Sequence, residues 1–364
     1  MAGKIQRIIH LQTGGHPNGC PLFTSQTMKT TTTLLQGRNT NSILYILTLA
    51  FCLAFVKPSA AQTYAPKDLT DEALVKKLPG FKNNYGTVNG VKLHYVTGGS
   101  GKLLVILPGW PQNWWSYHKI MPELAKRYKV MVIDYRGMGS SDKPAGGYDK
   151  KTIAGDVAQL LHQLGYQKAY ISGHDIGAQV AFSIAANYPD LTEKLVMMDV
   201  PHPDDSFAAT LMLPTIGTPT DKLDATRPFL WWFAFNQMRG LPEDLLAGRF
   251  AVAQKYIFHY LLLDDKSIGA FDRAVYAQAY NSRDAIRAGN GWYQAFPQDI
   301  KDIHSYQKLT MPVLGIGGPG FLWLGYVLPA ETTNPTIIKI ENSGHFIAEE
   351  NPQAVIKAIE DFLN

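Results

Sequence analysis

The stretch AYISGHDIGAQVAFSIAA, residues 169–186, decides the fold of this chain. Its first four residues are typical of a buried strand, and its last nine predict a helix. Between them, Gly173 and Gly177 flank a tight turn, because a residue without a side chain lets the backbone turn sharply without clashes. A strand, a sharp turn and a helix in this order place the central residue at the top of a sheet, near a helix N-terminus. That residue is Asp175, and the position suits an ionised carboxylate.

The residue type at this turn constrains the chemistry. An aspartate that attacks an acyl carbon forms an anhydride, whereas one that attacks an sp³ carbon forms an alkyl ester. We therefore interpret Asp175 as a nucleophile for a substrate with an epoxide ring or a carbon–halogen bond. A Gly-x-Asp-x-Gly pattern elsewhere is commonly a surface turn, but here the flanking strand and helix favour a catalytic elbow.

Short apolar or β-branched runs alternate with helical stretches along the rest of the chain, which is typical of a mostly parallel sheet covered by helices. The pair Asn89-Gly90 predicts a hairpin over residues 87–93. Further strands are predicted at residues 103–107, 130–133, 169–172, 195–198, 313–316 and 337–340. Further helices are predicted at residues 114–128, 153–164 and 353–362. The pattern predicts an α/β fold with an eight-stranded sheet.

The alternation of predicted strands and helices stops after the sixth strand. From there, aromatic and apolar residues recur at helical spacing, in residues 229–236, 251–263 and 273–280. We expect a helical cap over residues 201–310, inserted into a core made of residues 62–200 and 311–364. A cap in this place would roof the nucleophile and form the substrate pocket.

Residues 1–61 differ in composition from the rest of the chain. They are polar as far as Asn41 and then apolar over residues 42–56, a run shorter than the ~20 residues of a membrane span. Lys29 and Arg38 precede the run, and small residues follow it, as in a signal peptide.

We expect cleavage near Ala61, a mature chain that starts near Gln62, and secretion or export to the periplasm. Met28 is the expected translation start. An uncleaved segment that anchors the chain in a membrane is the alternative. With the signal removed, no stable membrane association is expected. Cys20 and Cys52 both lie in the leader, so the mature chain would have neither disulfides nor thiol catalysis.

The overall composition is that of a globular protein, with 46% hydrophobic and 18% charged residues among 364. The net charge of +4 comes from 34 basic and 30 acidic residues that are scattered along the chain, without a basic run that could follow phosphates. Nucleic acid is therefore not an expected partner. No motif calls for a metal or an organic cofactor, and none indicates an oligomeric state.

An ester on Asp175 must be hydrolysed by water, which requires a histidine base and a carboxylate to orient it. His345 follows the last predicted strand and precedes the terminal helix, where we expect the base. Residues 315–320, after the seventh strand, contain no carboxylate. Asp199, at the end of the sixth strand, is therefore assigned as the orienting acid, with the nearby Asp204 and Asp205 as alternatives.

Backbone N–H groups should stabilise the oxyanion that forms when water attacks the ester. Residues 108–111 follow the third strand, so the N–H groups of Trp110 and Ile176 are predicted to form the oxyanion hole. Asp134 and Arg136 follow the fourth strand, and we interpret them as structural.

From about Leu78 to Asn364, the chain resembles the epoxide hydrolase and dehalogenase branch of the α/β-hydrolases. The resemblance rests on the loop at residues 108–111, the Gly-His-Asp-Ile-Gly elbow, Asp199 followed by Val-Pro-His-Pro, and the final Ser-Gly-His. The family usually has a histidine where this chain has Pro108. The oxyanion hole uses backbone N–H groups, so the difference affects the expected site little.

The resemblance implies donors in the cap for the leaving atom. Residues 290–295 resemble the segment that supplies a ring-opening tyrosine in epoxide hydrolases and a halide-binding tyrosine in haloacetate dehalogenases, which makes Tyr293 the candidate. Related enzymes place a histidine or tryptophan near residues 230–233, so Trp231 or Trp232 could bind the leaving group. An indole N–H is too weak an acid to protonate an alkoxide, and Tyr293 would carry that step.

Two positions after the nucleophile bear on the substrate. Haloacetate dehalogenases, which this chain resembles, hold the substrate carboxylate with arginines where this chain has Ile176 and Gln179. Haloalkane dehalogenases have a halide-binding tryptophan where it has Ile176. The sequence thus favours a hydrolase that opens epoxides of small hydrophobic molecules to diols. Hydrolytic dehalogenation of a haloalkane or haloacid by the same ester route is the alternative, and a fold that binds a ligand without turnover is a further one.

Overall fold

The computed structural model describes residues 64–210 and 212–364. The predicted leader, its cleavage site near Ala61 and both cysteines lie outside these residues. In the described part of the chain, no helix is both long and apolar enough to cross a membrane.

One eight-stranded sheet forms the centre of the fold, with the strands in the order β1-β2-β4-β3-β5-β6-β7-β8. The two hairpin strands β1 and β2 are antiparallel to each other, and β2 is antiparallel to β4, whereas all other neighbours are parallel. The strands are β1 (Lys82–Val88), β2 (Val91–Gly98), β3 (Lys102–Leu107), β4 (Tyr128–Asp134), β5 (Ala169–His174), β6 (Thr192–Met198), β7 (Val313–Gly317) and β8 (Pro335–Lys339). The predicted eight-stranded, mostly parallel sheet is confirmed.

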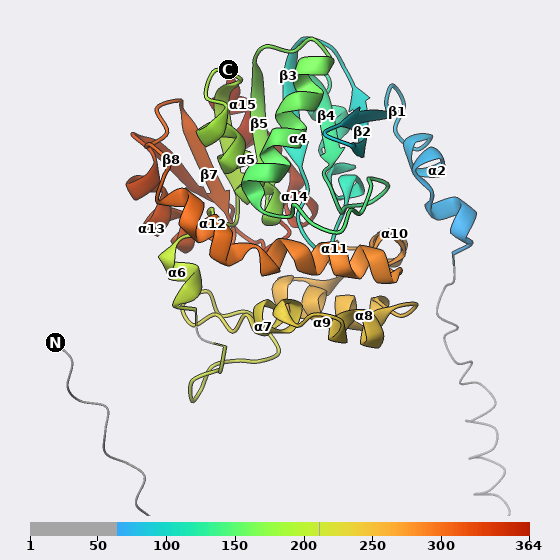
Figure 1. Cartoon of the computed structure of the whole chain (residues 1–364), viewed down its shortest axis with the longest axis vertical. Helices are drawn as coiled ribbons and strands as arrows, with labels where there is room; N and C mark the ends of the chain where they lie inside the picture. Colours follow the sequence, from blue (N-terminus) through green and yellow to red (C-terminus); the bar gives the residue numbers. More distant parts are fainter. Residues whose placement is uncertain (1–63, 211) are drawn as a thin grey trace, which may run out of the picture. The chain divides into compact units, whose positions relative to one another are not determined.

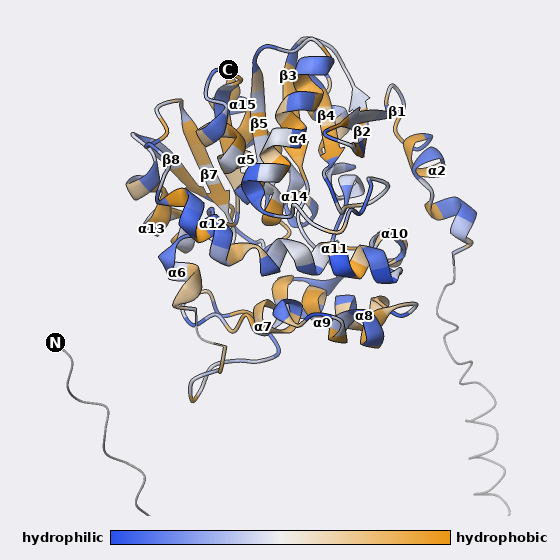
Figure 2. Cartoon of the chain, viewed as in Figure 1, coloured by the Kyte–Doolittle hydropathy of each residue, from blue (hydrophilic) through white to orange (hydrophobic). Residues whose placement is uncertain are grey.

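Helices cover the sheet on both faces, and Figure 1 shows α4 and α5 on the near face with α15 behind the strands. The core helices are η1 (Pro66–Leu69), α2 (Asp71–Val75), η2 (Trp114–Tyr117), α3 (Met121–Leu124), α4 (Lys150–Gln163), α5 (Ile176–Asn187), α13 (Phe321–Glu331), α14 (Ile347–Glu350) and α15 (Pro352–Leu363). Strands covered on both faces are expected to be apolar throughout. In agreement, every residue of β5 and β7 is buried, and Figure 2 shows the central strands as largely hydrophobic.

The segment between β6 and β7 is helical and forms the cap. Its elements are α6 (Asp205–Ala208), α7 (Trp231–Gln237), α8 (Leu241–Leu246), α9 (Ala251–Leu261), η3 (Asp265–Ser267), α10 (Ala270–Ala279), α11 (Arg283–Gln294) and α12 (Phe296–Ile303). Figure 1 shows α7 to α11 gathered at the end of the sheet where the parallel strands terminate. A helical cap after the sixth strand is thus confirmed, and it roofs the end of the sheet that carries the elbow.

The single helix predicted over residues 114–128 is wrong. The chain forms the short 3₁₀ turn η2 and the one-turn helix α3, and Tyr128 already begins β4. Pro122 lies in the first turn of α3, and since proline has no backbone N–H it suits a helix start and would break a longer helix. The N–H of Trp114 donates instead to Asp134, which ties this segment to the end of β4.

Candidate active site

The elbow carries Asp175 between β5 and α5. Its backbone lies at φ 53° and ψ −124°, a conformation that costs a non-glycine residue of the order of 1–3 kcal/mol and is found mainly at functional sites. A side chain at Gly173 would overlap the carbonyl group of Gly177, and one at Gly177 would overlap that of Leu107. Both glycines are therefore needed for the strand, the turn and the helix to approach so closely.

The carboxylate of Asp175 is buried and held by backbone groups. Its Oδ1 accepts a hydrogen bond from the N–H of Trp110 at 2.8 Å. Burial raises the pKa of Asp175, while the neighbouring His345 and the N–H groups of Ile176 and Trp110 act in the opposite direction. The structure thus brings both predicted oxyanion-hole donors to this carboxylate, and Oδ2 stays available on the side of the histidine.

His345 lies between β8 and α14, and its backbone N–H donates to the carbonyl of Leu261 in the cap. Its Nδ1 is 2.6 Å from Oδ2 of Asp199, and its Nε2 is 3.8 Å from Oδ2 of Asp175, which is too far for a hydrogen bond. Burial alone would lower the pKa of His345, but the hydrogen bond to Asp199 and the charges of both aspartates outweigh it and raise that pKa. Nε2 therefore faces the carboxylate of Asp175 without being bound to it.

Asp199 follows β6, as predicted, and its Oδ1 accepts a hydrogen bond from the N–H of Gly320 at 2.9 Å. The segment after β7 lacks a carboxylate and instead supplies N–H groups to Asp199. The two alternative acids lie elsewhere: Asp204 caps α6, and Asp205 is 3.2 Å from His304 at the surface. Of the three aspartates, the structure places Asp199 at the histidine.

His174 directly precedes Asp175, and no role was predicted for it from the sequence. Its Nε2 is 2.8 Å from the carbonyl oxygen of His345, and the two rings lie 4.5 Å apart. Burial, helped by the charge of His345, lowers the pKa of His174 well below its ordinary value. The neutral ring therefore donates Nε2–H to that carbonyl and holds the histidine loop. Its place inside the elbow motif is the signal that could have identified it.

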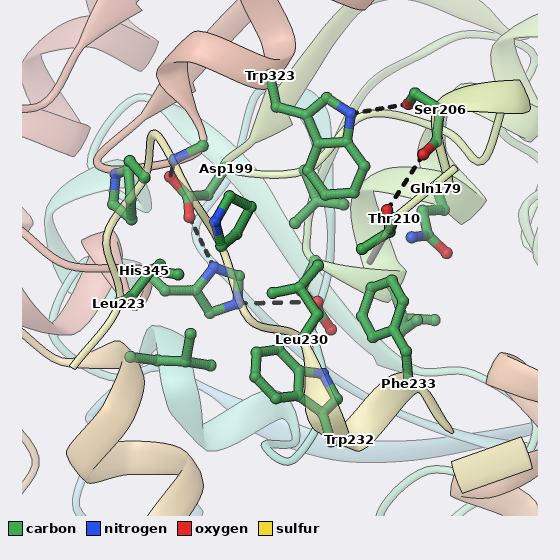
Figure 3. A pocket seen from close by; sticks show the side chains of 18 of the residues that line it. Gln179, Asp199, Ser206, Thr210, Leu223, Leu230, Trp232, Phe233, Trp323 and His345 are labelled. Atoms are coloured by element: carbon green, nitrogen blue, oxygen red, sulfur yellow. Dashed lines mark hydrogen bonds and ion pairs between the residues drawn. The ribbon is translucent and has the colours of Figure 1, made fainter. Parts of the chain in front are cut away.

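A cavity of about 340 Å³ separates the elbow from the cap. Its wall contains Asp175, His345 and Asp199 on the core side, and Tyr293 and Trp232 on the cap side. Figure 3 shows Leu230 and Trp232 beside His345 in this cavity, with Phe233 beyond Leu230. Most of the lining is apolar, as the sequence predicted from its aromatic cap.

Tyr293 lies near the end of α11, and only 1% of its surface is exposed. Its hydroxyl finds no hydrogen-bond partner by distance and angle among residues 64–210 and 212–364. Burial and the charge of Asp175 raise the pKa of Tyr293 well above its ordinary value, and the side chain of Trp232 opposes that change slightly. The hydroxyl therefore keeps its proton and has no competing acceptor among the described residues.

The two candidate tryptophans of α7 differ in position. Trp232 lines the cavity with Tyr293, whereas Trp231 faces a small separate hollow between α7 and α9 and does not line the main cavity. Both indoles line the small hollow, but adjacent residues on a helix point about 100° apart, and only Trp232 also reaches the main cavity. Trp232 is the one that the structure places in the cavity with Asp175.

Part of the lining was missed in the sequence. Trp323 and Tyr326 of α13, Ser206 of α6, and Thr210, which follows α6, line the cavity. The apolar run at residues 321–328 has the composition of a helix after the seventh strand, and this signal could have predicted α13.

The two residues interpreted as structural lie buried beside this edge of the sheet. Asp134 accepts from the N–H of Trp114 and contacts Nδ1 of His94 at 2.9 Å, and Arg136 pairs with Asp156 at 2.7 Å. In the described part of the chain, no three His, Cys, Asp or Glu side chains are grouped as a metal site.

The sequence profile of the α/β-hydrolase fold family matches residues 102–352, which include the elbow, the cap and the histidine loop. The chain is an α/β-hydrolase. Its epoxide hydrolase and dehalogenase relatives place it in the branch that the motifs indicated.

This hydrolase is 35% identical over 287 residues to the soluble epoxide hydrolase of a Corynebacterium species, an alignment that covers 76% of this chain and 95% of the relative. It is 34% identical over 174 residues to the fluoroacetate dehalogenase of a Burkholderia species, covering 46% of this chain and 54% of that one. The solved structure of the epoxide hydrolase CorEH without ligand superposes with a TM-score of 0.68 at 30% identity, and covers 78% of this chain and 98% of that chain.

Proposed function

We propose that this hydrolase opens epoxides to diols through a covalent ester on Asp175. The observation that carries the proposal is the pairing across the cavity: a buried aspartate on the core side and, on the cap side, a buried tyrosine hydroxyl that has a proton to give and no acceptor among the described residues. The likeness to the Corynebacterium epoxide hydrolase supports the same choice.

In the first step, Oδ2 of Asp175 attacks an epoxide carbon and the ring C–O bond breaks. The electron pair goes to the ring oxygen, which takes the proton of Tyr293. Oδ1 stays at the N–H of Trp110, so the carbonyl oxygen of the new ester already lies in the oxyanion hole.

In the second step, His345 removes a proton from water, and the oxygen of that water adds to Cγ of Asp175. The charge that develops on Oδ1 is stabilised by the N–H groups of Trp110 and Ile176. Collapse breaks the bond between Cγ and the ester oxygen, and His345 returns its proton to the departing alkoxide. The new carboxyl group gives up its proton to restore Tyr293, so one epoxide and one water yield one diol.

The pKa of His345 should change between the two steps in the direction that the mechanism requires. The negative charge of Asp175 helps to raise the pKa of His345 in the free enzyme. Esterification neutralises Asp175, which lowers the pKa of His345 at the moment when a neutral base is required. The same group thus favours charged histidine before the attack and neutral histidine after it.

A single turnover in ¹⁸O-labelled water tests the ester route. One oxygen of Asp175 leaves with the product and the attacking water replaces it, so mass spectrometry should find the label in the peptide that contains Asp175. Turnover that leaves this peptide unlabelled would contradict the proposal.

Hydrolytic dehalogenation is the second candidate, because Trp232 and Tyr293 together present two donors that could bind a halide, and because a fluoroacetate dehalogenase is among the relatives. Diol formation from styrene oxide should be compared with halide release from haloalkanes and haloacetates at equal enzyme concentration. We expect diol to form. Halide release without diol would favour the second candidate.

A further inference from the structure

One end of the cavity is polar, although it is remote from the catalytic histidine. Gln179, Ser206 and Thr210 line it, and Figure 3 shows them together across the cavity from His345 and Asp199. Such a cluster in a largely apolar cavity is the kind of feature that orients a ligand.

Two of these three side chains already have partners within the protein. The hydroxyl of Ser206 donates to Asp204 at 2.5 Å and accepts from the indole of Trp323 at 3.1 Å. The hydroxyl of Thr210 donates to the backbone carbonyl of Ser206 at 3.1 Å. Both hydroxyl protons are therefore used to build the wall of the cavity.

Gln179 differs from them. Only 1% of its surface is exposed, yet its side-chain oxygen has no hydrogen-bond partner anywhere in the described chain. Native proteins satisfy most buried polar groups, so an exception in the wall of a binding cavity points to a partner that is supplied by the ligand. The side-chain nitrogen of Gln179 likewise makes no hydrogen bond among residues 64–210 and 212–364, so the amide lacks both a donor and an acceptor, and a hydroxyl group of a ligand can supply either one.

The position of Gln179 relates this acceptor to the nucleophile. Gln179 follows Asp175 by four residues, and its N–H donates to the Asp175 carbonyl at 3.3 Å in the first turn of α5. Residues four apart lie on the same face of a helix, with Cβ atoms about 5–6 Å apart, and long side chains lean toward the helix N-terminus. The amide therefore lies on the side of the helix that carries the nucleophile.

We infer that Gln179 is a specificity-determining residue, and that the substrate is an epoxide with a hydroxyl or N–H group a few bonds from the ring. This inference rests on the proposed epoxide hydrolysis. The substrate donor binds the Gln179 oxygen while the ring lies between Asp175 and Tyr293. A carboxylate can accept from the amide N–H but leaves the buried oxygen without a donor, and an unsubstituted alkyl chain leaves the whole amide unsatisfied, so both are poorer substrates.

The test compares three epoxides of equal chain length: 1,2-epoxyhexane, its analogue with a hydroxyl on the far terminal carbon, and the corresponding epoxy acid. For the unmodified protein, kcat/KM should be highest for the epoxy alcohol. In Gln179→Leu, the preference for the alcohol over the alkyl epoxide should fall by about tenfold, as expected for one lost hydrogen bond. Gln179→Met, which keeps the length of the side chain, serves if the leucine variant does not fold.

Thr210→Val is the matched control, because Thr210 lines the same end of the cavity but its hydroxyl already donates to the backbone carbonyl of Ser206. It should leave the ratio between the two substrates unchanged. An equal ratio in the Gln179 variants and the unmodified protein would overturn the inference, as would a preference for the epoxy acid.

The two proposals fail in different ways. Absence of diol from all three epoxides would contradict the proposed function itself. Diol formation from every epoxide, with the same ratio in the Gln179 variants, would leave epoxide hydrolysis standing and refute only the role of Gln179.

Discussion

The core side and the cap side of the cavity are built on different principles. On the core side, Asp175, Asp199 and His345 follow three strands of the sheet, and backbone N–H groups or neighbouring side chains hold their polar atoms. On the cap side, Tyr293 and Trp232 project from helices, and the Tyr293 hydroxyl has no partner among the described residues. In the proposed mechanism, the core fixes where charge develops, and the cap supplies a proton donor in apolar surroundings.

This difference indicates that the core side and the cap side contribute to different parts of the reaction. Backbone dipoles do not reorganise during the reaction, so the core is suited to the attack and to the hydrolysis of the ester, which any substrate of this route requires. In the proposed mechanism, the cap determines which leaving atom is stabilised and which ligand fits. Substitutions on the core side should therefore stop the reaction, whereas those on the cap side should change its rate or its specificity.

The largest effect is expected on the core side. In His345→Gln, attack by Asp175 should still occur, but water is no longer activated, so turnover should fall by about 10⁴- to 10⁶-fold, the range for losing one member of a catalytic triad. Intact-mass spectrometry should show the protein heavier by one substrate molecule. A variant that turned over normally, or that stayed unmodified with substrate, would contradict the assigned role.

The next-largest effect is expected from the buried ion pair of Lys150 and Asp299, which connects the core to the cap. Lys150 of α4 is fully buried, and its Nζ contacts Asp299 of α12 at 2.7 Å and the carbonyl of Trp292 at 2.5 Å, directly beside Tyr293. Lys150→Met leaves Asp299 buried without its partner, which should lower the free energy of unfolding by about 3–5 kcal/mol.

Replacing both partners, as in Lys150→Met with Asp299→Leu, should recover most of that stability in urea unfolding, because no buried charge is left unpaired. The double variant should nevertheless form the ester more slowly, since Tyr293 loses the contact that positions its backbone. A double variant as unstable as the single one would contradict this account of the ion pair.

A moderate effect is expected from the cap-side donor. In Tyr293→Phe, the ring oxygen receives no proton, so ester formation should slow by about 100- to 1,000-fold, whereas hydrolysis of an ester already formed should keep its rate. Stopped-flow measurement of the two phases separates these steps. Tyr326→Phe is the control, because Tyr326 lines the same cavity but is 76% exposed. Equal slowing of both phases would exclude the proposed role in ring opening.

The sequence predicted the core side better than the cap side for a physical reason. The elbow, Asp199 and His345 follow strands, and parallel strands bring their carboxyl ends to one edge, so their meeting follows from the order of elements along the chain. Prediction was limited on the core side too. The helix predicted over residues 114–128 is too long, because a proline and a side-chain contact from another strand divide this apolar segment.

Contacts on the cap side depend on how helices rotate and pack, which periodicity alone does not determine. The choice between Trp231 and Trp232 needed the orientation of α7. Lys150 and Asp299 are 149 residues apart, and nothing local in either segment indicates their pairing. The same holds for the unpartnered oxygen of Gln179, since a missing hydrogen bond is visible only when the surroundings are known.

A smaller, pH-dependent effect is expected where the cap contacts the core at Glu349. Its carboxyl group accepts from Tyr276 of α10 at 3.0 Å and contacts Gln112 in the loop after Trp110. Burial raises the pKa of Glu349 to about 8 from an ordinary value of 4.5. The folded state thus holds a proton that the unfolded chain releases above about pH 4.5, so this stabilisation is complete below that pH and disappears as the pH rises toward 8.

Glu349→Gln stays neutral and should not lose this stability. Relative to the unmodified protein, the variant should gain of the order of 2 kcal/mol between pH 6 and pH 7.5, since each pH unit over which the folded state holds one more proton than the unfolded chain corresponds to about 1.4 kcal/mol. Thermal unfolding across that range measures the gain. A difference between the two proteins that did not change with pH would show that Glu349 is ionised in the folded state.

The smallest effect should distinguish the two tryptophans of α7. Trp232→Phe removes an indole N–H from the cavity while keeping an aromatic ring, so kcat/KM for an epoxide should fall only severalfold, because one neutral hydrogen bond contributes about 0.5–1.5 kcal/mol and Tyr293 still donates the proton. Trp231→Phe is the matched control and should change kcat/KM less than twofold, since Trp231 does not line the cavity. If the Trp231 variant lost more activity than the Trp232 variant, the orientation of α7 and the cap-side donor pair would both have to be reassigned.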